Sequence, residues 1–148
     1  EGAMQFTDLD VRDLLSFDDG LVQFAGHRAL IMDAQVMGIL RRELVHLIGV
    51  TATKGLLMRL GYAHGWVTAK SFKQDFPWDS DADWRRAGGR LHNMQGHVIV
   101  DVPKEAPDAQ GENPFAWSLW KQSYEAEQHI QHLGQSQECV CWALTGFA

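Results

Sequence analysis

Two polar aromatic side chains, the imidazole of His92 and the indole of Trp120, could together bind an aromatic hydroxyl group. A buried indole N–H needs an acceptor, because an unpaired buried polar group costs about 1–3 kcal/mol. A phenolic hydroxyl can accept from that N–H and donate to a neutral imidazole at the same time, whereas an unsubstituted hydrocarbon leaves both unpaired. The alternatives are a core histidine bonded to a backbone carbonyl and tryptophans that only fill the core.

A second set of candidate ligands lies on one predicted helix, Ser123–Leu133. Glu125, His129 and His132 are spaced by four and three residues, so they share one helix face. A carboxylate and two imidazoles placed in this way can bind zinc or iron. The same spacing suits an ordinary solvated face, which is the interpretation that the sequence alone favours.

The two cysteines, Cys139 and Cys141, are separated by one residue and make a poor disulfide staple. They suit thiols or a metal ligand in a reducing cytosol. They resemble half of a thiolate site, but structural zinc takes four ligands, and cysteines this close seldom both bind one ion. No C-x-x-C, H-E-x-x-H, G-x-G-x-x-G, phosphate-loop or G-x-S-x-G pattern occurs, so the sequence gives catalysis no positive support.

The bulk composition is that of an ordinary globular domain. Of 148 residues, 45% are hydrophobic and 22% are charged. A net charge of −6 argues against direct nucleic-acid contact, which needs clustered Lys and Arg. No apolar run approaches the roughly 20 residues that span a bilayer, and no signal peptide opens the chain, so we expect a cytoplasmic protein without membrane contact. Residues 1–13 are interpreted as a tag remnant and N-terminal segment, and residues 14–148 as one domain, incomplete at its C-terminus.

The first elements expected to position these side chains are short strands. Leu14–Phe17 and Leu21–Phe24 flank an Asp-Gly pair, which favours a hairpin because glycine accepts a positive φ. Arg28–Met32 is a candidate third strand.

Two later segments are also predicted as strands, and they carry the candidate ligand-binding pair. Leu91–Val102 is too rich in β-branched residues at its end for a preferred helix, and alternation places His92 on its apolar face. Phe115–Lys121 is the other strand, in which Trp117 and Trp120 point to opposite faces.

Helices are predicted between and after these strands. From Ala34 onward apolar residues recur every three or four positions, with the charged residues 41–43 on the other face. Gly49 ends this helix and Thr51 opens the next, so the two form a helical hairpin. A short helix, Asp81–Ala87, is closed by two glycines, and a last helix opens at Ser136. Helices over a mainly antiparallel sheet make an α+β domain.

Four segments together resemble the N-terminal sensory domain of aromatic-responsive, sigma-54-dependent transcriptional activators of the XylR, DmpR, PoxR and MopR type. The R-R-E-x-x-x-L-I-G-V and C-W-x-x-x-G-F/Y-A signatures are specific, and the likeness extends over most of the chain from about Leu14. The matching segments are Leu40–Tyr62 (LRRELVHLIGVTATKGLLMRLGY), Arg90–Val98 (RLHNMQGHV), Trp120–Glu125 (WKQSYE) and Val140–Ala148 (VCWALTGFA).

The resemblance implies a regulatory domain, and not an enzyme, that binds a phenol-like effector. Binding would relieve repression of a downstream AAA+ ATPase and so activate transcription of aromatic-catabolism genes. His92 and Trp120 match the positions that bind the effector hydroxyl in phenol-responsive members. The resemblance also implies a homodimer, downstream ATPase and DNA-binding domains, and a zinc site for which this sequence supplies one matching ligand, Cys141.

Two other functions stay open at this point. One is a dimerisation scaffold whose exposed aromatic residues form an interface. The other is a metal-binding or enzymatic module built from Glu125, His129, His132 and Cys141.

Overall fold

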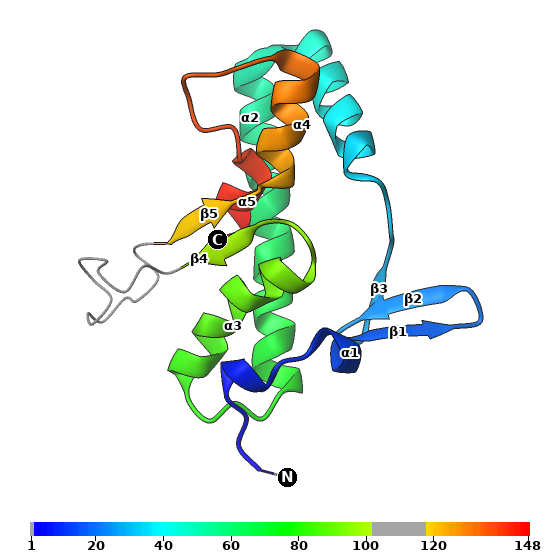
Figure 1. The fold of residues 1–148 in the computed structure, drawn as a ribbon, viewed down its shortest axis with the longest axis vertical. Helices are drawn as coiled ribbons and strands as arrows, with labels where there is room; N and C mark the ends of the chain where they lie inside the picture. The colour runs from blue at the N-terminus through cyan, green and yellow to red at the C-terminus, as the bar shows by residue number, and fades with distance from the viewer. Residues whose placement is uncertain (1, 102–117) are drawn as a thin grey trace.

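The computed structural model describes residues 2–101 and 118–148, and its helices α3, α4 and α5 pack on one long central helix, α2 (Figure 1). The elements in chain order are η1 (Phe6–Asp8), α1 (Val11–Leu14), β1 (Leu15–Asp18), β2 (Leu21–Phe24), β3 (His27–Ala29), α2 (Ala34–Asp75), α3 (Asp81–Met94), β4 (Ile99–Asp101), β5 (Leu119–Lys121), α4 (Tyr124–Leu133) and α5 (Trp142–Phe147).

The predicted helical hairpin is confirmed, because α2 consists of two helices joined at Gly49. Gly49 has φ 79° and ψ 165°, and this non-helical conformation interrupts the helix. Glycine adopts it without a steric clash because it has no Cβ. The chain turns over there, at the top of Figure 1, and the second half of α2 runs down the middle of the molecule. The prediction for the charged residues is wrong at Arg41, which is only 4% exposed, whereas its neighbour Arg42 is half-buried and Glu43 is exposed.

Two small antiparallel sheets complete the α+β fold, whose class is as predicted. In the first sheet, Asp19 and Gly20 have φ 43° and 77° and form the predicted hairpin turn between β1 and β2, and β3 follows. In the second, β4 pairs with β5 so that Val100 lies opposite Trp120. The predicted strand Phe115–Lys121 is represented by β5, and its first part, with Trp117, lies outside the described residues.

The largest difference from the prediction is α3, which continues through its two glycines to Met94, so that His92 lies on a helix and not on a strand. Ser80 caps this helix, its side chain accepting a hydrogen bond from the Asp83 N–H. Two glycines inside a helix each cost about 1 kcal/mol relative to alanine. Burial of Ala87 and Leu91, each 2% exposed, offsets that cost.

The C-terminal helices also differ in part from the prediction. The predicted helix after Ser123 is confirmed as α4, but its Glu125–His129 face is buried and not solvated. The last helix, α5, begins at Trp142 and not at Ser136. The Ser136 hydroxyl instead accepts a hydrogen bond from the Glu138 N–H in the connection between α4 and α5.

The hydrophobic core lies where the first residues of the chain pack against the lower parts of α2 and α3. Its buried members are Leu9, Leu14, Phe72, Ala87 and Leu91. Within the described residues, no helix has both the length and the apolar character needed to cross a membrane.

Candidate functional site

The structure brings His92 and Trp120 together, although they are 28 positions apart in the sequence and one lies on α3 and the other on β5. Their ring centroids are 6.4 Å apart. His92 is 4% exposed, and its Nδ1 is buried without a hydrogen-bond partner among the described residues. Burial, with smaller contributions from His97 and His64, lowers the pKa of His92 from 6.5 to about 4. At neutral pH this imidazole is therefore uncharged and can act as an acceptor.

Trp120 is half-buried, and its indole N–H already has a partner. The Nε1–H donates to the Ser118 hydroxyl oxygen at 3.1 Å. A ligand oxygen that took this N–H would replace the Ser118 hydroxyl, which can turn to water instead. The predicted donor is thus present, but it already has a hydrogen-bond partner in this structure.

His92 and Trp120 line a cavity of about 830 Å³, which we call the indole cavity. Its walls come from the lower half of α2, α3, β4, β5 and the end of α5. The aromatic residues of the lining are Phe6, Phe72, Trp84, Trp120 and Phe147. Phe147 is the aromatic ring nearest His92, with ring centroids 4.4 Å apart. The lining also contains polar side chains, among them Arg90, Asn93 and Ser118. A concave site with aromatic walls and polar groups that can orient a ligand is a usual form of a small-molecule site.

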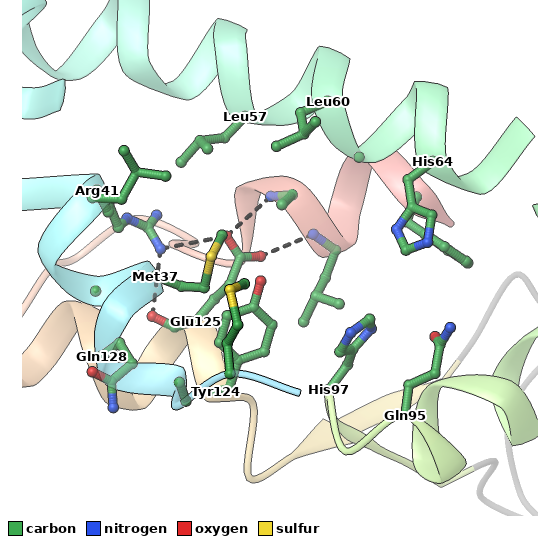
Figure 2. A pocket seen from close by; sticks show the side chains of 18 of the residues that line it. Met37, Arg41, Leu57, Leu60, His64, Gln95, His97, Tyr124, Glu125 and Gln128 are labelled. Carbon is green, nitrogen blue, oxygen red and sulfur yellow. Dashed lines mark hydrogen bonds and ion pairs between the residues drawn. The ribbon is translucent and has the colours of Figure 1, made fainter. Parts of the chain in front are cut away.

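A second cavity, of about 400 Å³, lies between the α2 hairpin, α4 and α5, and we call it the hairpin cavity (Figure 2). His64 of α2 and His97, in the turn after α3, face each other across one end of it, and Tyr124 lies beside His97. Burial lowers the pKa of His97 and raises the pKa of Tyr124 to about 12. Both groups are therefore neutral at neutral pH.

The other end of the hairpin cavity holds a buried ion pair between Arg41 and Glu125. Arg41 Nη1 lies 3.5 Å from Glu125 Oε1, and both side chains are 4% exposed. The Glu125 carboxylate also accepts from the N–H groups of Ala143 at 3.1 Å and Leu144 at 2.9 Å (dashed lines in Figure 2). Burial raises the pKa of Glu125 and lowers the pKa of Arg41. The carboxylate thus caps the first turn of α5, where negative charge is stabilising.

Arg41 fixes the start of α5 through further contacts. Its guanidinium lies 3.9 Å from the centre of the Trp142 ring, and it donates to the Val140 carbonyl. The Trp142 Nε1–H in turn donates to the Cys139 carbonyl at 2.8 Å. Arg41 and Glu125 were missed as a structural pair by sequence reasoning, and together they join α2, α4 and α5.

The candidate metal ligands are not gathered into one site. His129 is buried with its ring against Trp142, at 5.9 Å between centroids, and His132 lies against Gly38 of α2. The Cys141 thiol shares a hydrogen bond of 3.2 Å with the Ser123 hydroxyl, and burial raises its pKa.

Cys139 is exposed, and its thiol is free. Within residues 2–101 and 118–148, no group of three or more His, Cys, Asp or Glu side chains is placed to hold a metal ion. The donors around Cys141 in the described chain therefore do not fit a zinc ion by themselves.

Comparison with known proteins agrees with the sequence signatures. The family model described as an activator of aromatic catabolism matches residues 10–106. The chain belongs to this family. Its relatives in the family include the phenol regulator MopR of Acinetobacter guillouiae, 32% identical over 94% of this chain and 26% of that protein. The transcriptional regulatory protein XylR of Pseudomonas putida is 28% identical over 88% of this chain and 23% of its own length.

A solved structure shows the same family likeness in three dimensions. The phenol-responsive sensory domain of the transcription activator PoxR, crystallised with phenol, matches with a TM-score of 0.75 and 27% identity. The match covers 93% of this chain and 69% of that one. The chain spans about a quarter of the length of the two curated family members above.

Proposed function

We propose that this chain is a ligand-binding regulatory domain that senses phenol or a substituted phenol. The observation that carries the proposal is the meeting of His92 and Trp120 at one aromatic cavity, 6.4 Å apart. The neutral His92 imidazole can accept a hydrogen bond from the ligand hydroxyl, and the Trp120 N–H can donate a hydrogen bond to the hydroxyl oxygen. Two relatives support this ligand class, because one is named a phenol regulator and the other was crystallised with phenol.

The proposal for the whole protein follows the family. Effector binding would relieve repression of a downstream AAA+ ATPase in a sigma-54-dependent activator, because the effector binds the permissive arrangement more tightly than the repressing one. We expect the protein to act as a homodimer in the cytoplasm and to contact DNA through another domain. The chain itself would act as a sensor and not as an enzyme.

Zinc enters the proposal only through the resemblance, with Cys141 as its one ligand in this sequence. The described residues supply no complete donor set, so no step of the sensing mechanism is assigned to a metal. The metal-binding or enzymatic alternative is not favoured by any contact, because the Glu125 carboxylate is occupied by Arg41 and by two backbone N–H groups.

Calorimetric titration with phenol tests the function. His92→Ala and Trp120→Ala should each weaken binding by about 1–3 kcal/mol, or about five- to 150-fold in Kd, because each removes one partner of the hydroxyl. His46→Ala and Trp66→Ala are the matched controls, since both residues are exposed and lie outside the two cavities. Circular dichroism should show that all four variants fold. Wild-type affinity in both His92→Ala and Trp120→Ala would contradict the proposed site.

A further inference from the structure

Phe147 is the one aromatic residue of the described chain that lines both the indole cavity and the hairpin cavity. Its ring lies 4.4 Å from the ring of His92, which lines the first cavity, and 4.9 Å from that of His64, which lines the second. The ring of His97, which lines the second cavity, lies close to that of His92, with centroids 5.8 Å apart. The two cavities are therefore neighbours, and Phe147 is part of the wall that divides them.

The position of this wall is fixed by the packing of α5 on α2. Gly61 and Gly65 lie directly beneath α5, and a Cβ on either would overlap the backbone of Ala143 or Phe147. The Glu125 carboxylate of α4 holds the first turn of α5 through the Ala143 and Leu144 N–H groups. Phe147 thus projects from a helix that is held against α2 at both ends.

The hairpin cavity offers unused hydrogen-bonding atoms close to this wall. Gln95 Oε1 and His97 Nδ1 are buried and have no partner among the described residues, and both side chains lie at the His64 end of the cavity (Figure 2). A glutamine carbonyl only accepts, and a neutral imidazole nitrogen can accept. The charged Arg41–Glu125 pair lies at the opposite end and is already engaged. The free groups therefore suit a neutral hydroxyl and not an anion.

We propose that the hairpin cavity is a second compartment of the effector site, and that the Phe147 ring closes it off, so that an effector bound in the indole cavity cannot reach Gln95 and His97. With the ring removed, the joined cavities would take a two-ring phenol, whose second hydroxyl reaches Gln95 and His97. Phe147 is thus a residue that determines specificity. This inference rests on the proposed phenol-sensing function and deepens it.

The test compares three ligands by calorimetry: phenol, para-phenylphenol, and the biphenyl diol with one hydroxyl at each far end. In the wild-type protein the diol should bind no more tightly than para-phenylphenol, because its second hydroxyl cannot reach Gln95 and His97. Phe147→Ala should lower the Kd of the diol relative to that of phenol, because the hairpin cavity is then open to the second ring. In that variant the diol should bind about three- to tenfold more tightly than para-phenylphenol, through its second hydroxyl. Adding His97→Ala should reduce this advantage.

Phe17→Ala is the matched control, because this phenylalanine is 65% exposed on β1 and lines neither cavity. If Phe147→Ala does not fold, Phe147→Val removes most of the ring and should give the same ranking of ligands. An unchanged ratio of diol to phenol affinity in the Phe147 variant overturns the inference, as does a wild-type protein that already binds the diol about three- to tenfold more tightly than para-phenylphenol. Absence of phenol binding to the wild-type protein would instead contradict the proposed function.

Discussion

Adjacent residues of one signature have opposite structural roles in this chain. Arg41 is buried against Glu125 and the Trp142 ring, whereas Arg42 pairs with the exposed Glu43 at the surface. Both arginines were assigned to the solvent face because charged residues are seldom buried unless they are paired. The partner of Arg41 lies 84 positions away, so helical periodicity alone could not identify it. A weaker indication was available, since position 41 follows Met37 by four residues and falls on the apolar stripe.

The contrast between the two arginines is open to measurement. Arg41→Ala should lower the free energy of unfolding by about 3 kcal/mol or more, because it leaves the buried Glu125 carboxylate without its charged partner. Arg42→Ala removes an exposed pair and should cost less than about 1 kcal/mol. Urea denaturation of both variants gives the comparison. Equal losses of unfolding free energy in the two variants would show that the buried pair stabilises the fold no more than the exposed pair does.

At the scale of elements, local patterns predicted the hairpin of β1 and β2 and the break at Gly49. Both features depend on the residue types of a few adjacent positions. The local patterns failed at α3. The β-branched residues near Val98 and the two glycines both argued against a helix there, yet the helix reaches Met94 because Ala87 and Leu91 pack into a core with Leu9 and Phe72. The burial of His92 was therefore predicted correctly, but for the wrong reason. Packing against distant segments decided the element.

The close approach of α5 to α2 gives a prediction at this scale. Gly61→Ala should destabilise the protein by about 1–3 kcal/mol, because the new methyl group would overlap the Ala143 carbonyl and push the helices apart. Gly55→Ala lies on the same helix, where a Cβ meets open space. It should instead stabilise the protein by about 0.5–1 kcal/mol, through helix propensity. The melting temperatures of Gly61→Ala and Gly55→Ala should therefore shift in opposite directions from that of the wild-type protein. Shifts in the same direction would contradict the packing described for α5.

At the scale of the whole molecule, the signatures identified the family, but they could not show that the chain forms two neighbouring cavities. The residues that line those cavities come from η1 to α5, and their meeting depends on the path of α2. The surface of α2 also exposes large apolar side chains: Val36, Ile39, Leu40, Leu47, Ile48, Val50, Leu56, Leu60, Tyr62, Trp66 and Val67. The helical period identified the apolar stripe, and the structure shows that much of it is uncovered in this chain.

The buried histidines make the stability of the whole molecule depend on pH. Burial lowers the pKa of His92 to about 4 and also lowers the pKa values of His97 and His129 from 6.5. Below about pH 6.5 the unfolded chain binds more protons than the folded one, so the free energy of unfolding should fall as pH decreases toward 4. The raised pKa of Glu125 acts in the opposite direction.

Urea denaturation at about pH 7.5 and about pH 5.5 measures this dependence. His92→Gln should reduce the loss of stability between the two values, because its side chain does not titrate. His46→Gln, at an exposed position, should leave the loss unchanged. A loss as large in His92→Gln as in the wild-type protein would show that His92 takes up no extra proton on unfolding.

Helix α5 has six residues and is therefore only about 9 Å long. It begins directly after Cys141 and ends at Phe147, so the Cys141 thiol and the wall between the cavities lie at the two ends of one short helix. Thermodynamic reciprocity applies to such an arrangement. If occupancy of the indole cavity displaces α5, it alters the affinity of the Cys141 end for anything held there. Whatever binds at Cys141 then changes the affinity for the effector by the same factor.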